Sequence, residues 1–276
     1  MMTFVNNGGY DIYYETQGDL SVSPLLLING FTTQCVGWPP GFVAALMDAG
    51  FSIIRYDNRD VGLSTKSAQG RNYSLSDMAS DAVAVLDACK VDKAFVWGQS
   101  MGGMIAQTFA YTHPTRIAAL CSVMSTTGEQ GVGGASDAAI EALMTPNPAD
   151  REGHIAGFVR SGRVFAGPSP DDEWEAAKGA MQWDRCYWPA GAAHQMSAIM
   201  SSGSRERHLA TITCPTTVIH GAGDPLIQLS GGEATAAAIP GAKLVVLELM
   251  GHTLPPMYWP TYAVEMIELR ERAQSH

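Results

Sequence analysis

One short stretch, Val96-Trp97-Gly98-Gln99-Ser100-Met101-Gly102-Gly103, constrains the fold more than any other part of the sequence. Residues 94–97 form an apolar run that is typical of a strand buried on both faces. Apolar residues then recur at helical spacing from about Met101 to His113-Pro114, where the proline ends the helix. The chain must therefore turn sharply from strand to helix, and Gly-x-Ser-x-Gly at this turn predicts a strained serine whose hydroxyl faces a pocket.

The Gly-x-Ser-x-Gly pattern is a weak signal by itself, because a chain with 29 glycines would hold it by chance roughly one time in five. Four other serines follow a Gly-x pair without a second glycine, namely Ser52, Ser64, Ser136 and Ser169. Among these serines, Ser100 alone stands between an apolar strand and a periodic helix. It is therefore the candidate nucleophile rather than a serine in an ordinary glycine-rich turn.

Composition limits the class of protein and of ligand. A content of 46% hydrophobic and 16% charged residues is typical of a soluble globular protein, and 276 residues can bury a large core. The formal net charge of -10 disfavours nucleic acid and anionic membranes as partners, so we expect a small neutral or apolar ligand.

The chain begins without the basic flank and apolar core of a signal peptide, and no later apolar run is long enough to span a bilayer. We therefore expect a cytoplasmic protein, either a monomer or a homodimer. The cysteines are scattered without Cys-x-x-Cys pairing, which predicts reduced thiols and no structural zinc. They are Cys35, Cys89, Cys121, Cys186 and Cys214. We also expect no metal and no other cofactor.

Strands and helices alternate through the first half of the chain, which is the signature of an α/β fold with a mostly parallel central sheet flanked by helices. An opening hairpin is expected at residues 3–5 and 10–16, around the turn Asn7-Gly8-Gly9. Further strands are expected at 25–28, 51–56 and 117–124, with helices at 41–49 and after the capping box Ser74-x-x-Asp77.

The alternation stops between residues 128 and 210, where only helical pieces at 137–144, 150–159, 171–184 and 190–201 are expected. It resumes with strands at 216–220 and 243–249 and helices at 232–239 and toward 272. We therefore expect a core made of residues 1–127 and 211–276, with residues 128–210 inserted as a helical cap.

Two loops at late strand ends carry the partners that a serine nucleophile needs. Asp224 lies in the loop after the strand at 216–220, and His252 lies in the loop after the strand at 243–249. Parallel strands place their carboxyl ends at one edge of the sheet, so Ser100, Asp224 and His252 should emerge on the same side. An imidazole can take the serine proton and a carboxylate can orient the imidazole, so these residues are the candidate catalytic triad.

Other residues could fill the same roles. His220 is the main rival to His252, but it falls inside the strand before the acid loop, where we expect it to support that loop. Asp57 and Asp60 are alternatives to Asp224, although they lie in a polar turn where we expect Arg59 to pair with one of them.

Acyl transfer also needs donors for the oxyanion. The residue after the nucleophile, Met101, would give one backbone N–H, and Phe31 in the loop Asn29-Gly30-Phe31 would give the other.

The whole chain resembles α/β-hydrolase-fold serine hydrolases. Its segments Gly37-Trp38-Pro39 and Arg55-Tyr56-Asp57-Asn58-Arg59-Asp60-Val61-Gly62-Leu63-Ser64 resemble those of bacterial esterases related to aclacinomycin methylesterase. The resemblance implies the same triad and the same oxyanion donors. Asn29 departs from the pattern, because many relatives have histidine before the glycine. Lactonases, perhydrolases or cofactor-free haloperoxidases, and carbon–carbon bond hydrolases share the serine triad and remain alternatives, as does a non-catalytic binder of small ligands.

The expected cap is rich in side chains that could wall an apolar cleft over Ser100. We expect pocket walls from Trp38, Trp183, Tyr187 and Trp188, with further contributions from Phe31, Met101, Trp174, Met181, Met196 and Met200. No cluster of Lys or Arg in the cap could clamp a phosphate or carboxylate. The sequence thus predicts a carboxylesterase for uncharged esters with short to medium acyl chains, or for simple alkyl esters of a larger acid, and not a lipase.

Overall fold

The computed structural model describes residues 2–68 and 72–275. Within them, an eight-stranded sheet has the strand order β1-β2-β4-β3-β5-β6-β7-β8. Its strands are β1 (Thr3–Asn7), β2 (Tyr10–Gln17), β3 (Pro24–Ile28), β4 (Ser52–Tyr56), β5 (Ala94–Gln99), β6 (Ile117–Val123), β7 (Thr216–Gly221) and β8 (Lys243–Leu247). β2 pairs antiparallel with β1 and with β4, and the pairs from β4 to β8 are parallel, as the sequence predicts.

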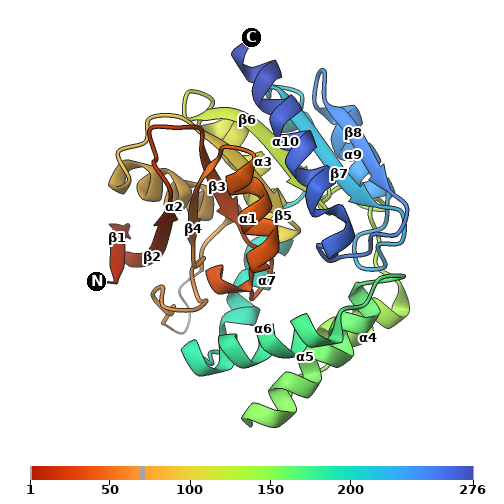
Figure 1. Ribbon diagram of the computed structural model, residues 1–276. Coiled ribbons are helices and arrows are strands. Elements are labelled where there is room, and N and C mark those ends of the chain that lie inside the picture. Colours follow the sequence, from red (N-terminus) through yellow and green to blue (C-terminus); the bar gives the residue numbers. More distant parts are fainter. Residues whose placement is uncertain (1, 69–71, 276) are drawn as a thin grey trace.

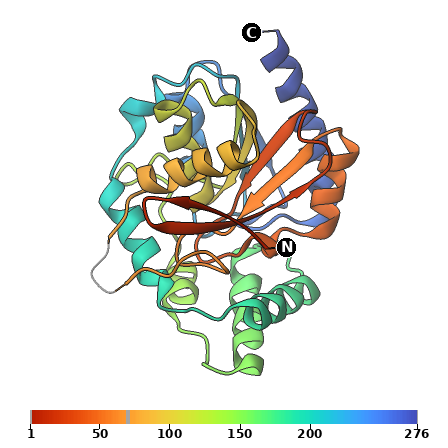
Figure 2. The same ribbon diagram turned by 90° about the vertical axis from the view of Figure 1, so that its left-hand side faces the viewer.

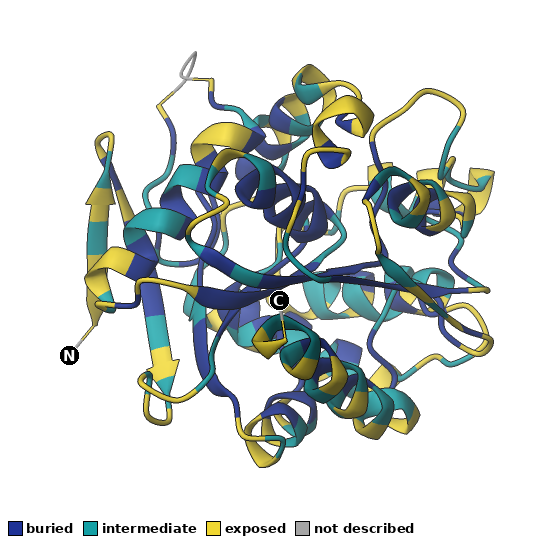
Figure 3. Cartoon of the chain, turned by 90° about the horizontal axis from the view of Figure 1, so that it is seen from above, coloured by how far each residue is buried: buried dark blue, intermediate teal, exposed yellow. Residues whose placement is uncertain are grey.

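Helices cover both faces of the sheet (Figure 3). The α-helices of the core are α1 (Pro40–Asp48), α2 (Leu75–Ala88), α3 (Met101–Thr112), α9 (Ser230–Ala238) and α10 (Trp259–Gln274). Short 3₁₀ turns lie at Cys35–Gly37 and Pro256–Tyr258. The predicted capping box is confirmed, because Ser74 and Asp77 exchange side-chain and backbone hydrogen bonds at the start of α2.

The alternation of side chains along β3 shows how the sheet separates two cores. Leu26 and Ile28 belong to the cluster that includes residues of α2 and α3, whereas Leu25 and Leu27 belong to the cluster that includes residues of α1 and α10. All four side chains are completely buried. A strand that is apolar at every position is therefore required here, because both of its faces are covered.

The segment between β6 and β7 contains α4 (Asp137–Met144), α5 (Arg151–Phe165), α6 (Asp172–Arg185), α7 (Gly191–Ser202) and the short α8 (Glu206–Leu209). Figures 1 and 2 show α4, α5 and α6 gathered at one end of the molecule, beyond one end of the sheet. The boundaries 128–210 for a separate cap stay a prediction. In the described part of the chain, no helix is both long and apolar enough to cross a membrane.

Candidate active site

Ser100 lies at the apex of the turn between β5 and α3. Its backbone has φ of 55° and ψ of −124°, which is a strained conformation for any residue with a side chain. Two glycines make this turn sterically feasible. A Cβ on Gly98 would collide with the carbonyl oxygen of Gly102, and a Cβ on Gly102 would collide with the carbonyl oxygen of Ile28. The strand, the helix and the neighbouring strand can approach each other only because both positions are glycine.

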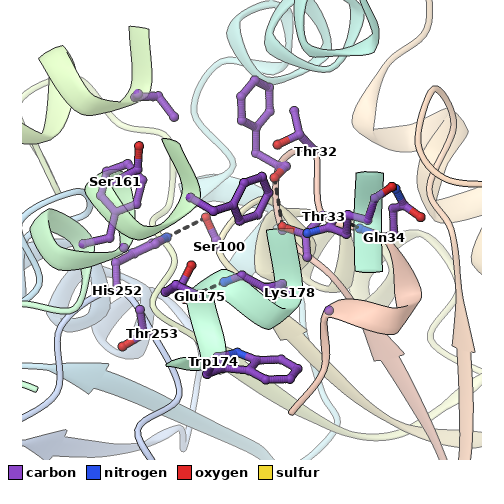
Figure 4. Close-up of a pocket in the computed structure, with 18 of the residues that line it drawn as sticks. Thr32, Thr33, Gln34, Ser100, Ser161, Trp174, Glu175, Lys178, His252 and Thr253 are labelled. Atoms are coloured by element: carbon purple, nitrogen blue, oxygen red, sulfur yellow. Dashed lines mark hydrogen bonds and ion pairs between the residues drawn. The ribbon is translucent and has the colours of Figure 1, made fainter. Parts of the chain in front are cut away.

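The structure joins Ser100, His252 and Asp224 in one chain of hydrogen bonds. The Oγ atom of Ser100 lies 2.9 Å from Nε2 of His252 (Figure 4), and Nδ1 of His252 lies 2.7 Å from Oδ2 of Asp224. Asp224 is buried, and its other oxygen accepts the backbone N–H groups of Leu226 and Ile227, each at 2.9 Å. The carboxylate is therefore fixed on one side by its own loop and orients the imidazole with the other.

The loop that carries His252 is hydrogen-bonded to the segment between β6 and β7. The backbone N–H of His252 donates a 2.6 Å hydrogen bond to the carbonyl of Phe165, the last residue of α5. The rings of Phe165 and His252 also meet edge to face, with centroids 6.5 Å apart. Phe165 of α5 therefore helps to fix the position of the His252 imidazole.

His220 supports the acid loop instead of reaching the serine. It is fully buried on β7, and its Nε2 lies 2.7 Å from the carbonyl oxygen of Ile227 and 3.6 Å from Oδ2 of Asp224. Burial lowers the pKa of His220, so the ring stays neutral and donates Nε2–H to Ile227.

The two alternative carboxylates serve other contacts. Asp57 forms an ion pair with Arg185 of α6 at 2.7 Å and accepts the backbone N–H of Cys35 at 2.7 Å. Asp60 accepts two hydrogen bonds from Ser67, from its backbone N–H and from its hydroxyl.

The prediction that Arg59 pairs with Asp57 or Asp60 is wrong. Its guanidinium instead binds Asp81 on α2, with Nη2 2.8 Å from Oδ1. The partner lies 22 residues away along the chain, and the fold of α2 against the sheet brings it close.

The loop after β3 lies against Ser100. An ideal Cβ on Gly30 would stand 3.2 Å from Cβ of Ser100, so Gly30 lies against the serine. The following residue, Phe31, lines the same cavity as Ser100. Met101 is the first residue of α3, where helix geometry leaves its backbone N–H without an acceptor in the helix. The side-chain amide of Asn29 donates a 2.9 Å hydrogen bond to the backbone carbonyl of Gln34, which joins the two ends of the loop.

Glutamines from α6 and α7 hold the same loop, and sequence reasoning missed them. Gln195 of α7 accepts the backbone N–H of Thr32 at 2.8 Å, and Gln182 of α6 accepts that of Gln34 at 2.8 Å. Both glutamines are buried. A polar residue on a predicted helix is usually expected to face solvent. The apolar residues around these glutamines in the expected cap were the one available sign that they could be buried and bind the loop.

A cavity of about 920 Å³ lies over Ser100 and His252. Of the predicted wall residues, the cavity is lined by Phe31, Trp174, Tyr187, Trp188 and Met196. Two predictions are corrected because the side chains belong to the core: Trp38 is buried and stacks on Phe42, and Met101 is buried beneath the turn. Trp183 is not among the lining residues either; it packs on the lining residue Tyr187, with ring centroids 4.1 Å apart. Met181 and Met200 are exposed.

The cavity also holds an ion pair that the sequence did not single out. Nζ of Lys178 lies 2.6 Å from Oε1 of Glu175, one helical turn earlier on α6. Figure 4 shows the two side chains pointing toward one another. The Glu-x-x-Lys spacing on an expected helix was the available signal. Among the described residues, no group of three or more His, Cys, Asp or Glu side chains is placed to hold a metal ion.

Comparison with known proteins agrees with this architecture. Residues 23–255 match the family model of the alpha/beta hydrolase fold. The chain is 30% identical over 274 residues to a rhodomycin D methylesterase of Streptomyces peucetius, covering 91% of this chain and 92% of the relative. It is 26% identical over 246 residues to a putative carbamate hydrolase of Variovorax paradoxus, covering 87% and 89% of the two chains. The solved structure of Est816, described as an N-acyl homoserine lactone degrading enzyme, superimposes with a TM-score of 0.74 at 29% identity, over 98% of this chain and 99% of that one.

The chain therefore belongs to the α/β-hydrolase fold family. Within that family it is a hydrolase related to bacterial methylesterases, in agreement with the resemblance drawn from its sequence.

Proposed function

We propose that the protein is a serine carboxylesterase that cleaves uncharged carboxylic esters through Ser100, His252 and Asp224. The observation that carries this proposal is the continuous hydrogen-bonded chain from Ser100 Oγ through His252 to Asp224, beside a cavity that Ser100 and His252 line. This geometry provides a nucleophile, a base in contact with it, and a carboxylate that fixes the base.

In the acylation step, Nε2 of His252 takes the hydroxyl proton while Ser100 Oγ forms a bond to the ester carbon. The carbonyl oxygen becomes an oxyanion, which the backbone N–H groups of Phe31 and Met101 stabilise. His252 then gives its proton to the departing alkoxide, and an acyl-enzyme remains. A water molecule, deprotonated by the same imidazole, attacks the acyl carbon and releases the acid and the free serine.

The cavity supports an ester whose acid portion is large. A volume of about 920 Å³ is near the upper end of the range for sites that enclose a drug-sized ligand. The relative named as a rhodomycin D methylesterase supports a methyl ester, the simplest alkyl ester, as the group that is cleaved. Such a substrate would seat its small alcohol group near His252 and its acid portion under the inserted helices.

Lactone hydrolysis is the second candidate, and the similarity to Est816 favours it. A lactone is a cyclic ester, so the same attack on the carbonyl opens the ring and leaves the alcohol attached to the acyl group. The two candidates therefore differ in substrate shape and not in catalytic residues.

The test is the rate of hydrolysis of a p-nitrophenyl ester series, an N-acyl homoserine lactone and an emulsified long-chain triglyceride by the wild type and Ser100→Ala. We expect Ser100→Ala to lose measurable turnover while its thermal unfolding stays close to that of the wild type. Ser161→Ala is the matched control, because Ser161 lines the same cavity and has no proposed part in catalysis.

Unchanged turnover in folded Ser100→Ala would remove the proposed nucleophile. A preference for the emulsion would instead favour a lipase. A fluorophosphonate probe on Ser100 without turnover of any ester would favour a non-catalytic binder.

A further inference from the structure

We propose that Lys178 and Glu175 form a polar recognition site for the acid portion of the substrate, and that this site selects esters carrying an uncharged oxygen, a carbonyl or hydroxyl, away from the ester group. The inference rests on the proposed function and specifies its substrate class. It follows from where the pair lies, what its atoms contact and what charge surrounds it.

The pair is built into the wall of the cavity that contains Ser100 and His252. Both side chains line this cavity, and both are largely buried, with 17% of the Lys178 side chain and 8% of the Glu175 side chain exposed. Glu175 is seated against α5 at Gly162, where a Cβ would collide with its side chain. The Lys178 ammonium also stands 5.8 Å from the ring of Phe158, another lining residue. Neighbouring groups on α5 therefore fix the pair in place.

The pair retains unused hydrogen-bonding capacity. An ammonium group has three N–H donors, and in the described residues the hydrogen bond of Lys178 goes to Oε1 of Glu175. The Lys178 side chain is 17% exposed and lines the cavity, so its ammonium is not fully enclosed by protein. Oε2 of Glu175 is not among the fully enclosed polar atoms that lack a partner. A substrate oxygen can accept from Lys178, and a substrate hydroxyl can also donate to Glu175.

Stability does not explain the presence of this pair. A buried ion pair can often be replaced by apolar residues of similar volume without loss of stability, because desolvation offsets the attraction between the charges. In a mainly apolar binding cavity, a small number of fixed polar groups instead orients the ligand. Lys178 and Glu175 are such groups.

The surrounding charge selects a neutral ligand. Lys178 is the one lysine or arginine among the lining residues of the described chain, whereas four carboxylates line the cavity: Asp60, Asp171, Glu173 and Glu175. A carboxylate or phosphate on the substrate would therefore meet more negative than positive charge. A ketone or hydroxyl can take the free donors of Lys178 without this repulsion.

The experiment uses p-nitrophenyl esters of straight-chain acids that carry a ketone at one of carbons 4 to 8, each compared with the unsubstituted ester of the same length. A third series carries a terminal carboxylate. The variants are K178M, which keeps the length of the apolar stem, and Lys178→Ala. K243M is the matched control, because Lys243 forms its ion pairs with Glu265 and Glu268 away from the cavity.

We expect the wild type to prefer the keto ester over the plain ester at one chain position by about tenfold or more in kcat/KM, as a hydrogen bond to a charged donor implies. K178M and Lys178→Ala should abolish this ratio, and K243M should retain it. A wild type with no preference at any position, or a preference that survives in a folded Lys178 variant, overturns the proposal. A preference for the ester with the terminal carboxylate that is lost in the Lys178 variants would refute the proposal that the site selects uncharged substrates. Failure of the wild type to hydrolyse any of the esters would instead refute the proposed function.

Discussion

The backbone N–H of Thr32 donates a 2.8 Å hydrogen bond to Oε1 of Gln195 and thereby ties the loop after β3 to helix α7. Thr32 has a left-handed φ of 56°, which is unfavourable for a β-branched residue. Gln195 is completely buried, and its Nε2 donates to the carbonyl of Arg59 at 2.9 Å, so its amide cannot turn away. The glutamine therefore stabilises a strained residue directly after Phe31, the proposed oxyanion donor.

Replacing Gln195 should weaken stabilisation of the transition state more than it weakens substrate binding. We expect Gln195→Leu to lower kcat about tenfold or more with a smaller change in KM, because the Phe31 N–H would lose its fixed direction. Steady-state kinetics on a p-nitrophenyl ester measure this split. Gln228→Leu, at an exposed position, is the control. A Gln195→Leu enzyme that changes only in KM would mean that the contact serves binding instead.

Asp224 is expected to act through His252. Asp224→Asn should lower kcat by a factor on the order of 10³–10⁴, because the amide cannot hold the imidazole in the same tautomer or stabilise its protonated form. Asp184→Asn, which alters only an exposed ion pair with Arg151, should leave turnover unchanged. Chelator treatment should also leave turnover unchanged. Near-normal turnover in Asp224→Asn would contradict the role of Asp224 and would leave Asp57 or Asp60 as the candidate carboxylate.

The elements of this fold could be predicted from sequence because their signals are local. Apolar runs bounded by turns gave the strands, and helical spacing gave α4, α6 and α7 to within about two residues. The common edge of Ser100, Asp224 and His252 followed from one general rule, that parallel strands end on the same side of the sheet. The structure places these side chains within hydrogen-bond distance of one another.

Side-chain partners far apart in sequence could not be predicted in the same way. Nothing in the sequence tells whether Trp38 points into the core or into the cavity, because both environments accept an apolar ring. Arg59 had acidic neighbours in its own turn, but its partner Asp81 lies on another element. The link between Gln195 and Thr32 spans 163 residues, so it depends on how the inserted helices dock on the sheet.

A buried ion pair joins α6 to the loop after β4. Arg185 at the end of α6 contacts Asp57, which is completely buried after β4. Arg185→Met should lower the free energy of unfolding by about 3 kcal/mol, because a buried carboxylate loses its counter-charge. Urea unfolding measures this loss, and Arg151→Met, in an exposed pair that solvent screens, should leave the free energy of unfolding nearly unchanged. If the double variant with Asp57→Asn were destabilised by the full sum of the single changes, the two residues would not be coupled.

The buried histidine beside the acid loop should make stability depend on pH. Burial lowers the pKa of His220 below its ordinary value of about 6.5, so in the folded protein its ring resists protonation. The unfolded chain takes up that proton as the pH falls below about 6.5, which shifts the equilibrium toward unfolding. The contribution of neutral His220 to stability is therefore fully present above about pH 6.5. It is lost progressively as the pH falls from there toward the lower pKa of the folded state.

His220→Asn should flatten this dependence. Asparagine does not titrate, so the slope of unfolding free energy between pH 7 and 5 should fall by up to about 1.4 kcal/mol per pH unit. Part of the slope should remain, because burial also lowers the pKa of His113 and of His154. The slopes are compared by urea unfolding at several pH values, which separates titration from any uniform loss of stability. Equal slopes in the wild type and in His220→Asn would show that the buried ring is protonated as readily in the folded protein as in the unfolded chain.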